Sequence, residues 1–332
     1  MALNTIPLDV PTRTYDDAGH DDVTEFRDHV MASRLHVIVH GPDNSWAIDD
    51  TVRYLRHLET LWSRFIPTSD ISRINQVAGT PVRVSPETIT LIERMVSAWS
   101  STDGLFDPTI LPIVIDHGYA TSHVDPSMTT TLPATTMTAA RYGRITSLAD
   151  VHIDARASTV TTPVGMALDP GGIGKGLASD MAVERLIRSG DMGAMVSIGG
   201  DLRMDGVPPD SGGWLVDIEY PVRRREPLTT LMVDRGGVAT SSTVSRTWKQ
   251  DGQRCHHVID PATGRQSVTD LATVTVFARA GWQAEAMATA AILKGSRSVI
   301  DHLEEHELSG LAVTGDGTVI ATRDIRELVG AS

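Results

Sequence analysis

Hydrophobic residues recur at helical spacing in some stretches of the chain and at strand-like density in others. In residues 45–65 the apolar positions Ile48, Val52, Leu55, Leu58 and Leu61 fall three or four apart, which predicts an amphipathic helix. The preceding residues 34–41, RLHVIVHG, have the β-branched composition of a strand. We therefore expect this helix to pack on that strand.

A second amphipathic helix is predicted in residues 85–104, SPETITLIERMVSAWSSTDG. Ser85 is suited to cap the N-terminus of a helix, Pro86 to occupy its first position, and Gly104 to follow its end. Further helices are predicted over residues 175–190, 282–295 and 297–308.

Short β-type runs follow one another between residues 193 and 280, and another lies near residues 311–323. Strands that come in runs, rather than alternating strictly with helices, favour an α+β fold over a doubly wound sheet. Residues 1–25 are polar and acidic and are predicted to form a mobile N-terminal tail. Residues 26–330 are predicted to form a single domain, in which the Thr-, Ser- and Pro-rich residues 119–138 form a loop or lid.

The composition argues against several classes of protein, including nucleic-acid-binding, disulfide-bonded and membrane-spanning proteins. The formal net charge of −13 over 332 residues argues against a nucleic-acid partner, because binding to phosphate backbones requires clustered Lys and Arg. Cys255 is the single cysteine, which excludes an internal disulfide and a Cys-based zinc site. The first residues lack the features of a signal peptide, and no apolar stretch reaches the ~18 residues of a membrane span. The sequence thus predicts a cytoplasmic protein with no membrane span.

Residues 171–176, GGIGKG, contain four glycines and one lysine. Gly-rich turns that open a helix commonly hold phosphate, because backbone N–H groups can approach it closely. The stretch is not a Walker A loop, since Asp169 occupies the leading glycine position, and Leu177 occupies the third glycine position of a dinucleotide turn. A tight connection into the helix is the alternative. Lys175 in a first helical turn opposes the helix dipole, which favours the phosphate-binding interpretation.

A second candidate is the stretch HHVIDPATG at residues 256–264. His257 is expected on a short strand, directly before a turn at residues 260–264. A histidine fixed in this way is suited to accept or donate a proton near neutral pH. The alternative is a pair of surface histidines.

Two further groups could contact a phosphate or a metal. Glu285 and Thr289 are four residues apart and share one helix face, where a carboxylate and a hydroxyl suit Mg²⁺. The alternative for this pair is a solvated helix face. Ser241, Ser242 and Thr243 follow a Gly-Gly pair and are expected in a hydroxyl-rich turn that can donate to phosphate.

Taken in chain order, seven stretches resemble the ApbE family, the FAD:protein FMN transferases. They are SRFIPTSDISRIN, GLFDPT, LDPGGIGKGLASD, SIGGDLR, VATSS, HHVIDPATG and AEAMATAAILKG, and the resemblance runs from about Met31 to Thr322. It implies a T-fold-like α+β architecture with mixed or antiparallel sheets flanked by helices. It also implies an enzyme that uses Mg²⁺, moves the FMN half of FAD to a Thr or Ser hydroxyl of an acceptor protein, and releases AMP.

The resemblance further implies site residues. The FAD contacts would fall on Met31, Phe65, Leu105, Phe106, Asp107, Asp169, Lys175 and Ile259. The metal would be held by the Gly172 carbonyl with Glu285, Ala288 (by position only) and Thr289, while His257 matches the functionally important histidine of the family. We therefore expect His257 and Lys175 to act in catalysis and Ser241 to assist in binding FAD.

The chain departs from the family pattern in four respects. Glu285 stands where Asp is usual, Gly174 replaces an alanine, and TSST at residues 240–243 replaces Thr-Ser-Gly followed by an aromatic residue. Many members also carry an export signal with a lipid-bearing cysteine, which this sequence lacks. Two other functions remain open at this stage. Water could use the same site in an FAD pyrophosphatase that releases free FMN and AMP, and a non-catalytic protein could simply bind FAD.

Overall fold

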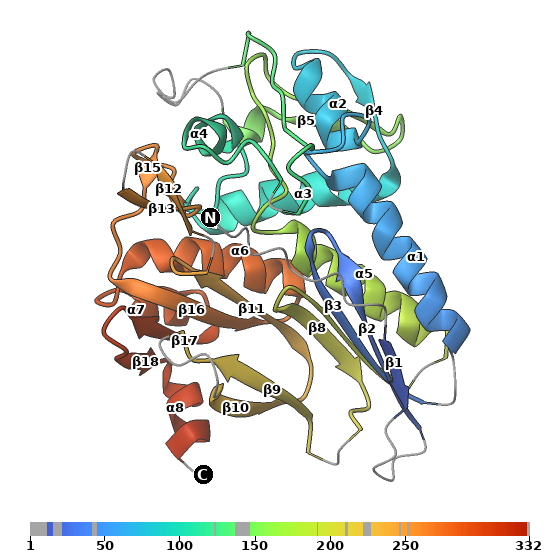
Figure 1. Cartoon of the computed structure of the whole chain (residues 1–332), viewed down its shortest axis with the longest axis vertical. Coiled ribbons are helices and arrows are strands. Elements are labelled where there is room, and N and C mark those ends of the chain that lie inside the picture. The colour runs from blue at the N-terminus through green and yellow to red at the C-terminus, as the bar shows by residue number, and fades with distance from the viewer. Residues whose placement is uncertain are drawn as a thin grey trace.

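The computed structural model describes residues 12–15, 22–41, 45–122, 124–136, 147–190, 192–209, 212–221, 227–245, 247–250 and 253–330. At its centre lies a nine-stranded sheet in which each strand is antiparallel to its neighbours (Figure 1). In spatial order its strands are β1 (Thr12–Tyr15), β2 (Val23–Val30), β3 (Ser33–His40), β7 (Gly193–Ile198), β8 (Asp201–Gly206), β11 (Gly236–Ser242), β16 (Leu271–Ala278), β17 (Ser309–Thr314) and β18 (Val319–Ala321).

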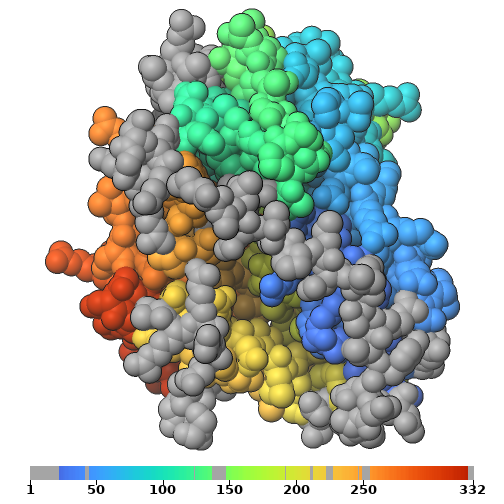
Figure 2. Space-filling model, viewed as in Figure 1, coloured from blue at the N-terminus to red at the C-terminus, as the bar shows by residue number. Residues whose placement is uncertain are grey.

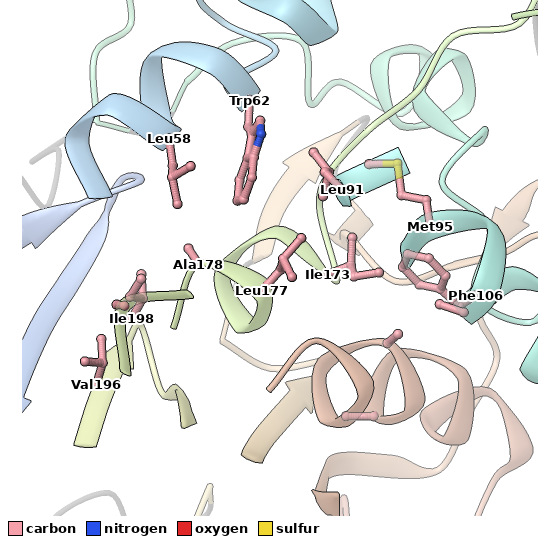
Figure 3. Packing of buried hydrophobic residues seen from close by; sticks show 14 of the residues in the cluster. Leu58, Trp62, Leu91, Met95, Phe106, Ile173, Leu177, Ala178, Val196 and Ile198 are labelled. Atoms are coloured by element: carbon pink, nitrogen blue, oxygen red, sulfur yellow. The ribbon is translucent and has the colours of Figure 1, made fainter. Parts of the chain in front are cut away.

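Helices cover one face of this sheet. They are α1 (Ser45–Trp62), α5 (Gly174–Arg188) and α6 (Gly281–Ala291), with α3 (Pro86–Ser101) stacked on them. Figure 3 shows Leu58 and Trp62 of α1 beside Leu177 of α5 and Ile198 of β7, all buried. The helix predicted over residues 45–65 is present as α1, but it packs mainly on α5 and β2 rather than on the expected strand at residues 34–41, which is β3.

The opposite face is covered by a hairpin of β9 (Trp214–Glu219) and β10 (Pro227–Val233), together with α8 (Arg323–Gly330). A second core forms there around Trp214, Met204 and Leu311. Because both faces of an antiparallel sheet are covered and the helices are segregated mainly to one of them, the fold is α+β, which confirms the predicted class.

Smaller elements surround these layers, and Figure 1 shows several of them beyond the helical face. The short helices are α2 (Asp70–Gln76), α4 (Leu111–Asp116) and α7 (Val299–Glu305), with 3₁₀ turns η2 (Leu148–Asp150) and η3 (Ile292–Lys294). The short strands are β4 (Val82–Arg83), β5 (His152–Asp154), β6 (Thr159–Thr161), β12 (Thr247–Gln250), β13 (Gln253–His256), β14 (Ile259–Asp260) and β15 (Arg265–Gln266).

The caps predicted for α3 are present. The Ser85 hydroxyl accepts a hydrogen bond from the Thr88 amide at 3.1 Å, and Gly104 follows the helix with a φ of +75°. The helix predicted over residues 297–308 is shorter, because α7 spans only Val299–Glu305. None of the helices in the described ranges is both long and apolar enough to cross a bilayer.

The N-terminal boundary needs correction. Residues 1–25 were expected to form a tail, yet β1 pairs with β2, and β2 itself begins at Val23. β1 becomes the edge strand of the sheet and pairs with Thr24–Arg27 of β2. Of the expected loop at residues 119–138, the described part contains a single isolated bridge, between Thr121 and Thr129. Residues 123, 137 and 138 lie outside the described residues.

Candidate active site

The glycine-rich loop enters α5 through a tight turn. The Gly171 amide donates to Asp169 Oδ1 at 3.0 Å, and the Gly174 amide donates to the Pro170 carbonyl at 2.8 Å. Gly172 has a φ of +84°, and a Cβ placed on it would lie 3.1 Å from Thr289 Oγ1 and 3.2 Å from Phe106 Cε2. The residue must therefore be glycine both for its backbone conformation and for its close approach to α6.

The backbones of α5 and α6 nearly touch. A Cβ on Gly176 would lie 2.3 Å from the Gly281 carbonyl oxygen. In return, the Asp180 carboxylate of α5 accepts hydrogen bonds from the Gly281 and Trp282 amides at 2.7 and 3.0 Å, which caps the N-terminus of α6. Burial raises the pKa of Asp180 to about 6, although the two amide hydrogen bonds act to lower it. This contact places Glu285, one turn into α6, beside the start of α5.

Lys175 is engaged by two carboxylates from distant segments. Its Nζ lies 2.7 Å from Glu285 Oε1 and also pairs with Asp201 at the start of β8. The second oxygen of Glu285 accepts a hydrogen bond from the Gly176 amide at 2.8 Å. The side chains of Asp201 and Glu285 are only 7% and 6% exposed. Two buried carboxylates share this one ammonium, so the three side chains carry a formal charge of −1.

Hard oxygen donors surround this pair. Thr289 Oγ1 donates to the Glu285 carbonyl at 3.0 Å and lies 3.3 Å from Ser241 Oγ. Ala288 is fully buried and has no polar side chain, so only its carbonyl could serve as a ligand. Mg²⁺ requires only one or two carboxylates and completes its shell with water and phosphate. The donor set and its excess negative charge fit such a cation, although no group of three His, Cys, Asp or Glu side chains occurs in the described part of the chain.

Two of the expected FAD contacts lie close to the loop in space. The Asp169 amide donates to the Pro108 carbonyl at 2.8 Å, which ties the loop to the FDP stretch at residues 106–108. In that stretch Phe106 is buried in the main core, and Asp107 Oδ1 accepts hydrogen bonds from the amide and the hydroxyl of Thr109 at 2.8 and 2.7 Å. Leu105, the residue before Phe106, packs against the same core.

Met31 lies in the turn between β2 and β3, where its φ is +51°. The adjoining strand reaches the Lys175 region, because the Gly199 amide donates to the Arg34 carbonyl at 2.8 Å. A Cβ placed on Gly199 would lie 3.8 Å from Lys175 Cδ. The turn between β7 and β8 thus stands between the β2–β3 hairpin and the lysine.

Two expectations about local structure were wrong. His257 does not lie on a strand: β13 ends at His256, and His257 is a half-buried residue between β13 and β14. Ser241 lies on β11 rather than in a turn, because the pairing of β11 with β16 continues through Ser242. The turn at residues 260–264 is confirmed, since the Gly264 amide donates to the Asp260 carbonyl at 2.8 Å.

Ile259 lies in a small cluster beside α4, away from the main core. It packs there with Ile113 and Val114. The contacts described above, which bring Gly172, Lys175, Glu285, Thr289 and Ser241 together, involve neither Ile259 nor His257.

Comparison with known proteins agrees with this architecture. A family model described as the ApbE family matches residues 31–313. The chain belongs to the ApbE family. Among its curated relatives, an FAD:protein FMN transferase of Vibrio cholerae is 28% identical over 269 residues, covering 80% of this chain and 79% of the relative. Another, from Treponema pallidum, is 28% identical over 262 residues, covering 75% and 71%.

Solved structures of the ApbE family have the same fold. The apo form of the Pseudomonas stutzeri flavinyl transferase ApbE is 25% identical, with a TM-score of 0.77, and covers 96% of this chain and 100% of the solved one. The ApbE protein of Thermotoga maritima is 23% identical, with a TM-score of 0.80 and coverage of 92% and 99%. The likeness extends over nearly the whole chain and supports the T-fold-like architecture expected from the family.

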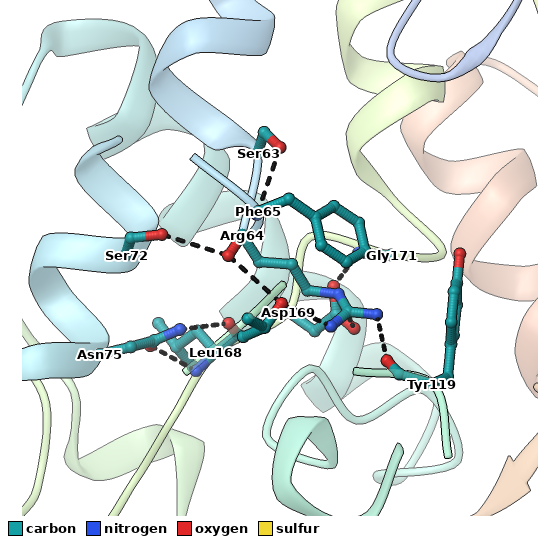
Figure 4. Close-up of polar contacts among 10 residues, drawn as sticks. Ser63, Arg64, Phe65, Ser72, Asn75, Tyr119, Leu168, Asp169 and Gly171 are labelled. Atoms are coloured by element: carbon teal, nitrogen blue, oxygen red, sulfur yellow. Dashed lines mark hydrogen bonds and ion pairs between the residues drawn. The ribbon is translucent and has the colours of Figure 1, made fainter. Parts of the chain in front are cut away.

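In this ApbE-family chain, sequence reasoning missed two residues of the site, Arg64 and Asp201. Asp201 lies in the stretch SIGGDLR and pairs with Lys175. Arg64 directly precedes Phe65 and pairs with Asp169 across 3.6 Å between Nε and Oδ2 (Figure 4). The local signal for Arg64 was its place directly before the expected FAD contact Phe65, and the signal for Asp201 was its place in the family-like stretch SIGGDLR.

Proposed function

We propose that this chain transfers the FMN half of FAD to a Thr or Ser hydroxyl of an acceptor protein, with release of AMP and with the aid of Mg²⁺. The observation that carries the proposal is the convergence of Gly172, Lys175, Glu285 and Thr289 where α5 meets α6. The name FAD:protein FMN transferase, borne by relatives that match three quarters or more of this chain, supports the same reaction.

Positioning and charge neutralisation dominate the transfer of phosphoryl groups, so the site needs cationic groups and close backbone approach more than covalent chemistry. The missing side chains at Gly171 and Gly172 would let backbone amides reach the diphosphate of FAD. Lys175, held in place by Asp201 and Glu285, would bring a positive charge close to the phosphate oxygens.

Glu285, Thr289 and the carbonyl of Gly172 would hold Mg²⁺, with Ala288 contributing no more than its carbonyl. When bound, the ion neutralises charge on the phosphate oxygens. Ser241, whose Oγ lies 3.3 Å from Thr289 Oγ1, would donate to the phosphate next to Thr289. The surrounding side chains would bind the rest of FAD: Met31, Phe65, Leu105, Phe106, Asp107, Asp169 and Ile259.

The chemical step breaks one P–O bond and forms another. The hydroxyl oxygen of the acceptor attacks the phosphorus on the FMN side, and the bond to the AMP phosphate breaks. In this proposal His257 accepts the proton of the attacking hydroxyl, a role that an imidazole can fill near neutral pH.

The proposal is tested by incubating the purified chain with FAD, MgCl₂ and an acceptor protein that carries an exposed Ser/Thr motif. Flavin fluorescence that survives a denaturing gel, together with an equal amount of AMP, is the expected result. AMP release without a labelled acceptor would indicate an FAD pyrophosphatase instead. Bound flavin without AMP would indicate a non-catalytic FAD-binding protein.

A further inference from the structure

Arg64, two residues beyond the end of α1 at Trp62, is a buried cation that joins four segments of the chain. Its side chain is only 5% exposed. Nη1 donates to Thr130 Oγ1 at 2.8 Å, and Nη2 donates to the Tyr119 carbonyl at 2.9 Å. Its guanidinium carbon also lies 4.2 Å from the ring centroid of Phe65 and 4.8 Å from that of Tyr119. A buried guanidinium in this many contacts is fixed in one orientation.

The guanidinium reaches the glycine-rich loop through Asp169. Arg64 Nε lies 3.6 Å from Asp169 Oδ2, while the other oxygen of Asp169 accepts the Gly171 amide at 3.0 Å. Figure 4 shows Arg64 between Phe65, Tyr119 and Asp169. The orientation of Gly171, whose backbone is expected to approach the diphosphate, thus depends on a carboxylate that Arg64 holds.

The residue before Asp169 is fixed independently from α2. The Asn75 side chain donates to the Leu168 carbonyl at 2.9 Å and accepts from the Leu168 amide at 2.7 Å. Because Asn75 secures the chain entering the loop, loss of Arg64 is expected to leave the fold in place. The change should be confined to Asp169, Tyr119 and Thr130, which Arg64 contacts directly.

The charge of Arg64 matters as well as its geometry. The side chain of Asp169 is 16% exposed, and Asp169 lies just before the glycine-rich residues that are expected to bind a diphosphate. An uncompensated carboxylate at this position would repel that anion, and the repulsion is stronger where water is excluded. The guanidinium next to Asp169 offsets this repulsion.

We propose that Arg64 is a positioning residue for FAD binding: it orients Asp169 and offsets its charge, and it anchors Tyr119 and Thr130 near Asp169. This inference rests on the proposed function. Arg64 acts through Asp169 and the Tyr119 backbone, not on the reacting atoms.

The test measures the Kd for FAD by calorimetry, and kcat and KM by AMP release, for the full chain with Mg²⁺. Arg64→Met keeps the apolar stem and removes the charge, and is expected to raise Kd and KM about tenfold while kcat changes less than about threefold. Arg64→Lys keeps the positive charge but loses the several N–H donors of the planar guanidinium, so it should raise Kd only about threefold. In an Asp169→Asn background, Arg64→Met should raise Kd less than about twofold, because the charge that it compensated is gone.

Arg53→Met is the matched control, since Arg53 lies on the exposed side of α1 with 71% of its side chain accessible. Its Kd should equal that of the wild type. If Arg64→Met does not fold, Thr130→Val removes the acceptor of Nη1 at constant shape and should raise Kd about threefold.

A lowered melting temperature with Kd and KM unchanged would show that Arg64 has a structural role only and would overturn the inference. An undiminished tenfold effect in the Asp169→Asn background would overturn the part assigned to Asp169. Failure of the wild type itself to bind FAD would overturn the proposed function and this inference with it, which distinguishes the two failures.

Discussion

The ammonium of Lys175 lies 2.7 Å from a carboxylate oxygen of Glu285, 110 residues further along the chain. The backbone of Gly176 donates to the other oxygen of the same carboxylate at 2.8 Å. Lys175 and Gly176 stand in the first turn of α5 and Glu285 in α6, so this relationship joins the glycine-rich loop to the helix expected to carry the metal ligands.

Replacing Glu285 by Gln keeps the shape of the side chain and removes its charge. We expect the rate of AMP release from FAD to fall by about 10²–10³-fold, because charge stabilisation in a buried site is the largest single contribution to such a reaction. The measurement is a Mg²⁺ titration of AMP release. Glu184→Gln is the matched control, because Glu184 lies on α5 with 59% of its side chain exposed. Wild-type activity and Mg²⁺ dependence in Glu285→Gln would exclude Glu285 from the site.

Gly176→Ala tests the close contact between α5 and α6. Its Cβ would lie 2.3 Å from the Gly281 carbonyl oxygen, so the helices must move apart. We expect a loss of about 1–3 kcal/mol in the free energy of unfolding, measured by urea denaturation. In Gly174→Ala, two residues away, the nearest atom is Pro170 Cβ at 3.4 Å, and that variant should keep its stability. Equal stability of the two variants would contradict the packing described.

Gly172→Ala tests the turn beside Thr289. A φ of +84° is strained for alanine, and its Cβ would press on Thr289 Oγ1 at 3.1 Å. We expect the Kd for FAD, measured by calorimetry, to rise by about tenfold or more, because the strain and the clash both displace the loop. Gly190→Ala imposes similar strain at a φ of +103° with no neighbour within 4 Å, and its Kd should be unchanged. Equal affinity in both variants would argue against the loop as the FAD site.

His302 gives a prediction on pH. Burial lowers the pKa of His302 to about 4 from an ordinary value of 6.5. The nearby charges of His306 and Lys294 lower it further, and Asp103 partly opposes them. The folded protein therefore favours the neutral ring. Its contribution to stability is complete above pH 6.5 and is lost as the pH falls toward 4. The raised pKa of Asp180 has the opposite effect: it increases stability as the pH falls from about 6 to 4. This effect is the same in the wild type and in a His302 variant.

On going from pH 7 to pH 5, His302→Leu should therefore lose less unfolding free energy than the wild type, or gain some through Asp180, as measured by urea denaturation at both values. His57→Leu, at an exposed position on α1, should retain the wild-type difference. An identical pH difference in His302→Leu and the wild type would refute the assignment.

The sequence predicts those structural features that depend on residues close together in the chain. The apolar spacing of α1, the Ser85 cap and the glycine-rich entry to α5 are local patterns, and the structure contains each of them. The resemblance to the ApbE family added the convergence of α5 and α6, which no local pattern could have supplied.

Contacts between distant segments were beyond sequence reasoning. Arg64 meets Asp169, and Asp180 caps Gly281 across 101 residues; neither pair has a spacing that marks it. The exact end of β13, which leaves His257 off the strand, is also set by pairing with β12 rather than by composition. Tertiary pairing decides such boundaries, so they vary by a residue or more from local prediction.

The central claim is that the glycine-rich loop and the Lys175–Glu285 pair hold the diphosphate of FAD. Competition calorimetry tests it most directly: FAD is titrated into the full chain with MgCl₂ in the presence of ADP or of adenosine, which differ only in the diphosphate. We predict that ADP displaces FAD at least about tenfold more strongly than adenosine, because only ADP presents the charged group that the site binds. Equal displacement by the two compounds, or no binding of FAD at all, would contradict the account.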